Sequence, residues 1–189
     1  MNKAELYHEI YEQKEKLGNL ISDYWNLYSG MDTWYFWFNV ASVLIPLVIL
    51  YFAIDRQRIF EISFFGFAVH VLWANVDSVL SSNNYLVHAH TLTHLLPVGI
   101  NMTAVLLPVA FMLLYQFCTN RNKNFYIYTI ILSVIFAYIF GSFSLATELL
   151  KMAKGMNLTY LFLIDLAVVF PALWLTKLFH KIKNSGKEK

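Results

Sequence analysis

The sequence predicts an all-α integral membrane protein, a bundle of five transmembrane helices preceded by an amphipathic helix. Of its 189 residues, 58% are hydrophobic and only 14% are charged, against roughly 25% charged residues in soluble domains. Five apolar runs, each nearly free of charge, cover more than half of the chain, at residues 34–54, 62–80, 97–118, 125–146 and 158–178. Each run is close to the roughly 20 helical residues that cross a bilayer core.

Residues 1–31 form a separate segment that precedes the bundle. Apolar side chains recur there at helical spacing, for example at Ile10, Leu17, Ile21 and Tyr28, with acidic residues and lysines between them. Such a helix can lie on the membrane surface or pair with another helix, although its acidity disfavours anionic lipid. We expect an amphipathic helix packed against the bundle, with partner binding as the alternative.

The bundle itself is expected over residues 32–180. Aromatic residues gather at two of its borders, in Trp34–Trp37 and in Phe125–Tyr128, as is typical of the headgroup level of a membrane. The connection at 81–96 is longer than the others, and it forms either an external loop or a re-entrant segment.

Three prolines mark particular places in the spans. Pro97 suits the first turn of the third helix, where a missing N–H costs nothing. Pro46 and Pro108 lie inside spans, where proline kinks a helix.

The distribution of lysine and arginine predicts the orientation. With five spans, one side of the membrane carries nine of these residues, namely Arg56, Arg58, Arg121, Lys123, Lys177, Lys181, Lys183, Lys187 and Lys189. The other side has only Lys151 and Lys154 close to the membrane. The positive-inside rule then places the basic tail, residues 181–189, in the cytoplasm and the N-terminus outside the cell.

Composition and motifs exclude several functions. A net charge of +2 and the absence of a Gly-rich phosphate loop argue against nucleic-acid or nucleotide binding. The single cysteine, Cys118, excludes an internal disulfide and a CxxC metal motif. No serine stands in a G-x-S-x-G elbow. We therefore expect no cofactor and no nucleophilic catalysis.

Polar residues inside the spans predict an intramembrane network. The second span places Ser63, Gly66, His70, Ala74, Asp77 and Ser81 at steps of three and four, and the fourth aligns Ser133, Ala137, Gly141 and Glu148. Small residues at this spacing let helices approach closely, so both stripes are interpreted as packing faces with Asp77 and Glu148 pointing inward. Asn101 and Asp165 complete the predicted network of His70, Asp77, Asn101, Glu148 and Asp165.

Three interpretations of these groups stay open. The first is a buried network of hydrogen bonds and ion pairs that fixes the bundle. The second is a path for protons or small cations along Asp77, Glu148, Asp165 and His70. The third is an external metal site, with zinc as the candidate ion, built on His90-x-x-x-His94 and completed by Asp77, His88 or Glu148. It requires the third span to be helical from its loop onward, which would align His90, His94 and Asn101, and it would allow a metal-dependent hydrolase.

The stretch Leu107-Pro108-Val109-Ala110-Phe111-Met112-Leu113-Leu114-Tyr115-Gln116-Phe117 is followed by a short polar turn and an aromatic-rich helix that ends near Glu148. This pattern resembles a family of small uncharacterised multi-spanning membrane proteins of endospore-forming Gram-positive bacteria. The resemblance covers roughly residues 95–180. It implies a multi-pass protein of the plasma membrane and transfers no catalytic residue.

These observations favour a non-enzymatic accessory component of a membrane assembly. The alternatives are a small proton- or cation-conducting protein and a membrane-embedded metal-dependent hydrolase. Besides the lipid bilayer, the expected partner is a second copy or another membrane protein, bound through the N-terminal helix or the face of Ser133, Ala137 and Gly141.

Overall fold

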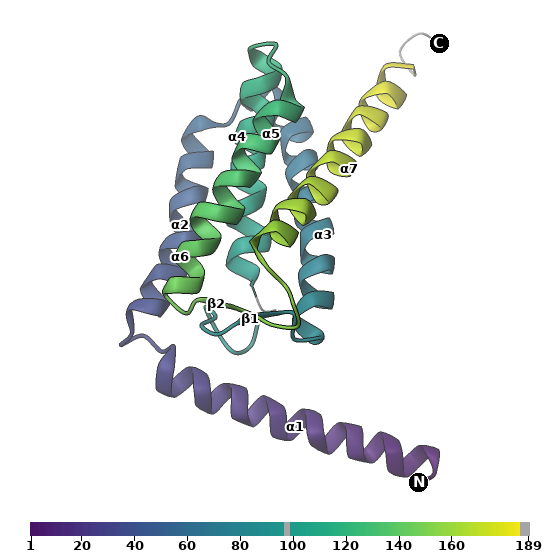
Figure 1. Ribbon diagram of the computed structural model, residues 1–189. Coiled ribbons are helices and arrows are strands. Elements are labelled where there is room, and N and C mark those ends of the chain that lie inside the picture. The colour runs from purple at the N-terminus through teal and green to yellow at the C-terminus, as the bar shows by residue number, and fades with distance from the viewer. Residues whose placement is uncertain (97–98, 186–189) are drawn as a thin grey trace.

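The computed structural model describes residues 1–96 and 99–185, and nearly all of its regular structure is helical (Figure 1). The elements are, in order, α1 (Lys3–Tyr28), α2 (Trp34–Ala53), the 3-10 turn η1 (Arg56–Arg58), α3 (Ile59–Ser82), β1 (Leu86–His88), the π-helical segment η2 (Asn101–Leu106), α4 (Leu107–Asn120), α5 (Phe125–Val134), the π-helical segment η3 (Ile135–Phe140), α6 (Gly141–Ala146), β2 (Leu150–Met152) and α7 (Leu158–Ser185).

The five predicted spans are confirmed as helices long and apolar enough to cross a membrane. They cover Trp34–Ala53, Arg56–Ser82, Asn101–Asn120, Phe125–Ala146 and Leu158–Lys183. The third begins later than predicted because Gly99 has a φ of +69°, which no right-handed helix contains. Pro97, the expected first-turn residue, lies outside the described residues, and so do residues 186–189 of the expected tail.

The spanning helices form an upright bundle, and α1 lies crosswise at one of its ends (Figure 1). A capping box starts α1, because the Asn2 side chain accepts a hydrogen bond from the Glu5 N–H at 2.9 Å and the Glu5 carboxylate accepts one from the Asn2 N–H at 2.8 Å. No residue of α1 is buried. Its stability therefore depends on local hydrogen bonds, on the contacts of its last turns with the loop after β1, and on what its apolar side meets outside the chain.

The hydrophobic core lies where α3 packs between α4 and α7. Phe65, Phe111 and Val169 come from these three helices and are completely buried. Gly66 makes the close approach of α3 to α4 possible, because a Cβ there would collide with the Met112 sulfur. The prediction that this stripe of α3 is a packing face is confirmed at Gly66, whereas Ser63 at its start is exposed.

The small-residue face of the fourth span is also a packing face. Ser133, Ala137 and Gly141 are all buried, and a Cβ at Gly141 would lie 2.9 Å from Cδ2 of Leu158 at the start of α7. The face is thus covered within one chain. The prediction that Glu148 points inward is wrong, because the helix ends at Ala146, two residues earlier.

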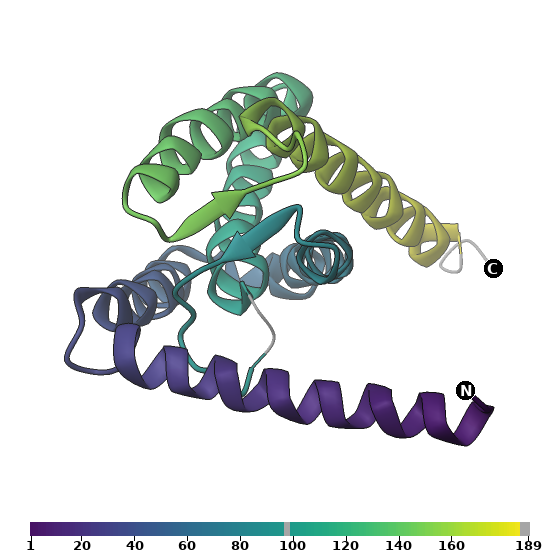
Figure 2. The same ribbon diagram turned by 60° about the horizontal axis from the view of Figure 1, so that its bottom comes forward.

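The segment 81–96 neither spans nor forms a helical hairpin in its described residues. It contributes β1, which pairs antiparallel with β2 from the next connection at the same end of the bundle, with Val87 opposite Lys151 and His88 opposite Leu150. Figure 2 shows this two-stranded sheet lying over the bundle end beside α1. We call this end, which carries β1, β2 and α1, the cavity end.

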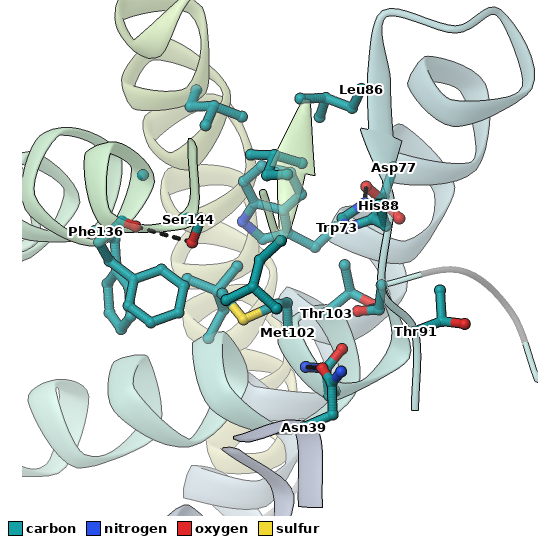
Figure 3. A pocket seen from close by; sticks show the side chains of 18 of the residues that line it. Asn39, Trp73, Asp77, Leu86, His88, Thr91, Met102, Thr103, Phe136 and Ser144 are labelled. Atoms are coloured by element: carbon teal, nitrogen blue, oxygen red, sulfur yellow. Dashed lines mark hydrogen bonds and ion pairs between the residues drawn. The ribbon is translucent and has the colours of Figure 1, made fainter. Parts of the chain in front are cut away.

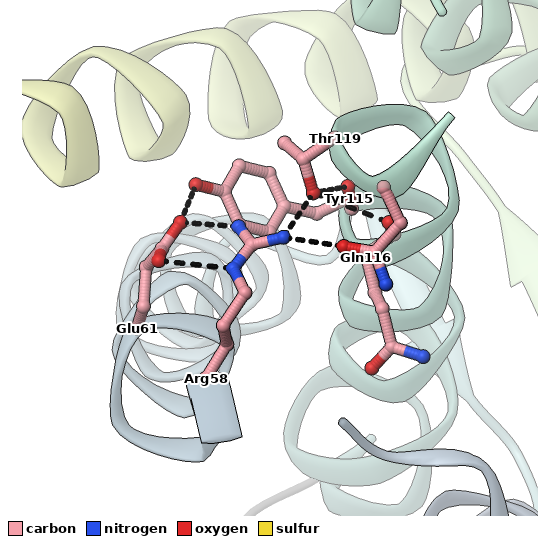
Figure 4. Close-up of polar contacts among 6 residues, drawn as sticks. Arg58, Glu61, Tyr115, Gln116 and Thr119 are labelled. Carbon is pink, nitrogen blue, oxygen red and sulfur yellow. Dashed lines mark hydrogen bonds and ion pairs between the residues drawn. The ribbon is translucent and has the colours of Figure 1, made fainter. Parts of the chain in front are cut away.

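A polar cluster at the opposite end was missed by the sequence analysis. The Arg58 guanidinium donates to both oxygens of Glu61, at 2.6 and 3.2 Å, and also to Thr119 Oγ1 at 2.9 Å and Asn120 Oδ1 at 2.6 Å (Figure 4). Tyr115 Oη donates to the same Glu61 carboxylate. These bonds join the start of α3 to the end of α4. Because the charges of Arg58 and Glu61 neutralise each other within the cluster, we assign it a structural role.

Candidate functional site

A cavity of about 100 Å³ lies inside the bundle at the cavity end. Its walls come from α2, α3, η2, α4, η3, α6 and α7, and residues of β1 and β2 border it as well. Figure 3 shows Asp77 and His88 beside each other on one wall, with Phe136 and Ser144 on the opposite wall. Since a water molecule needs roughly 10–15 Å³ on this measure, the cavity has room for several waters or one small molecule.

The first polar feature of the cavity is the pair of Asp77 and His88. Asp77 stands near the end of α3 and is buried. His88, which belongs to β1, donates a hydrogen bond from Nε2 to Asp77 Oδ1 at 2.8 Å. Gly99 closes over this pair: a Cβ at that position would lie 2.8 Å from Asp77 Oδ2 and 2.9 Å from His88 Nε2. A glycine is therefore required both by its positive φ and by the space.

The second feature is a carboxyl group that has no cationic neighbour among the described residues. Asp165 of α7 is 3% exposed, and its Oδ1 accepts a hydrogen bond from Trp73 Nε1 of α3 at 3.0 Å. Trp73, Asp77 and Asp165 all border the cavity. A buried carboxylate without a positive partner is costly, so this group is either protonated or neutralised by a cationic group in the cavity.

The third feature is a cluster of amides that closes the side of the cavity toward α2. Asn101 Nδ2 donates to Asn39 Oδ1 at 2.7 Å and to Ser42 Oγ at 3.0 Å. Asn39 Nδ2 in turn donates to the His90 carbonyl at 3.1 Å. These bonds join α2, η2 and the loop after β1. Asn101 is therefore held by Asn39 and Ser42, not by the other residues of the predicted network.

Two of the walls are π-helical. In η2 the Leu107 N–H donates to the Met102 carbonyl five residues back, and in η3 the Gly141 N–H reaches the Phe136 carbonyl in the same way. Pro108 stands two residues after the end of the first of these segments, so the predicted irregularity near this proline takes the form of a widened turn. Short π-helical segments recur at functional sites because they re-aim side chains inside a helix. Here both border the same cavity.

The remaining network residues lie at its margins. His70 Nδ1 donates to the Thr103 carbonyl at 3.0 Å, behind the wall that Thr103 forms. The Glu148 side chain is 66% exposed and lies 3.6 Å from Lys151 Nζ. Of the predicted network, Asp77, Asn101 and Asp165 thus border the cavity, His70 supports it and Glu148 is outside.

The predicted alignment of His90 and His94 on one helical face is wrong. Residues 91–96 form bends rather than a helix, because the turn at Gly99 separates them from the third span. His90 is buried, its Nδ1 lies 2.8 Å from Ser29 Oγ, and its ring stacks on Tyr35 at 3.4 Å between centroids. His94 instead packs near Trp25, with ring centroids 5.5 Å apart.

The four metal candidates His88, His90, His94 and Asp77 are therefore not gathered around one point. Only His88 and Asp77 pair directly, and the part of the chain that the structure describes holds no group of three or more histidine, cysteine, aspartate or glutamate side chains arranged for a metal. Burial lowers the pKa of His90, which keeps this ring neutral.

Sequence reasoning missed Trp73, Gly99, Ser29 and Tyr35 at the site. Trp73 carried a usable signal, since it stands four residues before Asp77 and therefore on the same face of α3. The other three depend on tertiary contacts between segments that the sequence does not pair.

No protein-family model, curated protein or solved structure matches this chain. The class of protein is therefore the one that the fold and cavity define: a helical bundle with five helices able to span a membrane and a partly polar cavity near one end.

Proposed function

We propose that this chain is a non-enzymatic, ligand-binding component of a membrane assembly, and that its ligand is a small, mainly apolar molecule with one cationic nitrogen. The observation that carries the proposal is the pair of buried carboxyl groups, Asp77 and Asp165, on a cavity whose other walls are mostly apolar. Pockets of this composition are the usual form of small-molecule sites.

The charge of the cavity selects the ligand class. No lysine or arginine occurs among the described residues that line it. Each carboxyl group uses Oδ1 for its one side-chain hydrogen bond, so Oδ2 of Asp77 and of Asp165 has no partner in the described structure. An ammonium group would supply both the donors and the positive charge that these oxygens lack. An anionic molecule would meet two acceptors and no cation.

Ion conduction remains the second candidate, because Asp77 and Asp165 also belong to the path predicted for it. Between the cavity and the opposite end, however, the described residues form the hydrophobic core around Phe65, Phe111 and Val169. That arrangement supports binding at one end of the bundle more than passage through it. Liposomes containing the protein should then hold an imposed pH gradient as long as empty liposomes do.

Photolabelling tests the binding site. The full chain in mild detergent is labelled with a short alkyl amine that carries a diazirine, and the modified peptides are mapped by mass spectrometry. We expect labels on η2, η3 and α7, competed by unlabelled alkyl amine but not by the alkanoate of equal length. Ala137→Leu, which fills the cavity, and Asp165→Asn should reduce this labelling.

Glu148→Gln is the matched control, since it removes an exposed carboxylate at the same end of the bundle. Its labelling should equal that of the wild type. Labels spread over lipid-facing helices, or an alkanoate that competes as well as the amine, would contradict the proposal.

A further inference from the structure

The helix α1 carries an apolar stripe that nothing in the described chain covers. Leu6, Ile10, Leu17 and Ile21 follow one another at steps of four and seven, which places them on one side of the helix. Between 46% and 55% of each of these side chains is exposed. Tyr24 and Tyr28 continue the stripe toward the bundle.

The adjoining side of α1 is mostly charged, although Leu20 and Leu27 interrupt it near the C-terminal end. It presents Glu5, Glu9, Glu12, Lys16 and Asp23, at steps of three, four and seven. The helix therefore has one mainly apolar and one mainly charged side, which is the pattern of a helix that lies in a membrane interface.

The contacts of the last turns show which way the stripe is directed. The Tyr24 ring lies 6.1 Å from the ring of His90, at the end of the bundle. Trp25, beside the stripe, donates from Nε1 to the Thr91 carbonyl at 3.0 Å. The apolar side of α1 is thus turned toward the bundle, and its earlier members face the same way.

The N-terminal part of α1, which carries these earlier members, reaches past the spanning helix α3. The helix lies crosswise to the spanning helices (Figure 1), and its N-terminal part continues past α3 in the end view (Figure 2). With 26 residues its length is about 39 Å. Trp37, which is 61% exposed at the start of α2, marks the membrane border at this end, since exposed tryptophan favours the headgroup level.

We infer that α1 is an in-plane membrane helix whose stripe of Leu6, Ile10, Leu17 and Ile21 is inserted among the lipids next to the bundle. The occupant of this surface is the lipid leaflet in which the bundle itself sits. Because α1 has five acidic side chains against three lysines, the binding is apolar and requires no anionic lipid.

Spin labels on neighbouring residues test this inference in the full chain. In a Cys118→Ala background, Ile10→Cys and Leu17→Cys report on the stripe, and the adjacent Glu9→Cys and Lys16→Cys report on the polar side. Each variant is spin-labelled and reconstituted in phosphatidylcholine nanodiscs with one chain per disc. The collision rates of the spin label with oxygen and with a water-soluble nickel chelate are then measured.

The expected result is a higher oxygen-to-nickel accessibility ratio for labels at positions 10 and 17 than for labels at positions 9 and 16. The ratio at positions 10 and 17 should correspond to a depth of about 5–10 Å in the membrane. Equal exposure of all four sites to nickel would overturn the inference in favour of a solvated helix. Strong spin–spin broadening at Ile10 and Leu17 in discs with two chains, with low oxygen access, would overturn it in favour of pairing with a second copy.

Discussion

His88 Nε2 lies 2.8 Å from Asp77 Oδ1 and joins the first strand to the end of α3. Both side chains are shielded from solvent. The bond therefore fixes the sheet over the cavity and also occupies Oδ1 of one of the two carboxyl groups that the cavity presents.

Breaking this bond should loosen the cavity end. We expect Asp77→Ala to lower the free energy of unfolding by about 1–3 kcal/mol, since it leaves the buried imidazole without a partner. His88→Ala should cost a similar amount, and the two losses should not add. Unfolding of the purified protein by titration with a denaturing detergent measures both, with His8→Ala as the control, because the pair of His8 and Glu12 is fully on the surface. Additive losses would mean that the two side chains are not coupled.

The space at Gly99 gives a second prediction. Gly99 and Gly155 both have positive φ, at +69° and +79°, but only at Gly99 would an added methyl group meet heavy atoms within 4 Å. Gly155→Ala should therefore cost only the roughly 1–2 kcal/mol of the left-handed conformation. Gly99→Ala should cost about 1–3 kcal/mol more, because its methyl group displaces Asp77 or His88. Equal losses in the free energy of unfolding for the two variants would show that a methyl group at Gly99 does not clash with Asp77 or His88.

The pKa of His90 predicts a pH dependence of stability. Burial holds this pKa below its ordinary value of 6.5, so below about pH 6.5 the unfolded chain binds a proton that the folded chain excludes. Stability should fall as the pH drops from 7 toward 5, by at most about 1.4 kcal/mol per pH unit from this group. Replacing the ring in His90→Gln should flatten that part of the curve. An unchanged slope between pH 5 and 7 would assign the acid sensitivity to other groups.

The guanidinium of Arg58 is the basis of a fourth prediction. Its fork serves Glu61, Thr119 and Asn120 together, a geometry that a lysine ammonium does not reproduce. Arg58→Lys should lower the free energy of unfolding by about 1–3 kcal/mol, whereas Arg56→Lys should change it by less than about 0.5 kcal/mol. Amine binding in the cavity, at the other end of the bundle, should stay the same in folded Arg58→Lys. Lost binding would mean that the two ends are coupled.

The sequence predicted the elements that depend on local pattern. The five apolar runs became the five helices, and the small residues Ser133, Ala137 and Gly141 lie on a buried face as their spacing indicated. Asp77 and Asp165 were identified only from the free-energy cost of placing a carboxyl group in lipid, which makes such a group inside a span face the protein interior.

What the sequence did not predict depends on where elements stop and what they meet. Glu148 was assigned to a helix face that ends at Ala146, and His90 and His94 were assigned to a helix that starts only after Gly99. The pairing of Leu86–His88 with Leu150–Met152 joins segments about 60 residues apart, and each segment has only three residues, too few for an alternating pattern to identify a strand. Trp73 acquires its role through Asp165 on α7. Arg58 pairs locally with Glu61, but its contacts with Thr119 and Asn120 lie on another helix.

Binding of a small organic cation in the cavity, through Asp165 and Asp77, can be measured by calorimetric titration of hexylamine into the purified protein, with the same detergent solution as the blank. We predict saturable binding of one amine per chain, weakened at least about tenfold, or ~1.4 kcal/mol, in Asp165→Asn and unchanged in Glu148→Gln. Heat that matches the blank, or equal binding of hexylamine by Asp165→Asn and the wild type, would contradict this function.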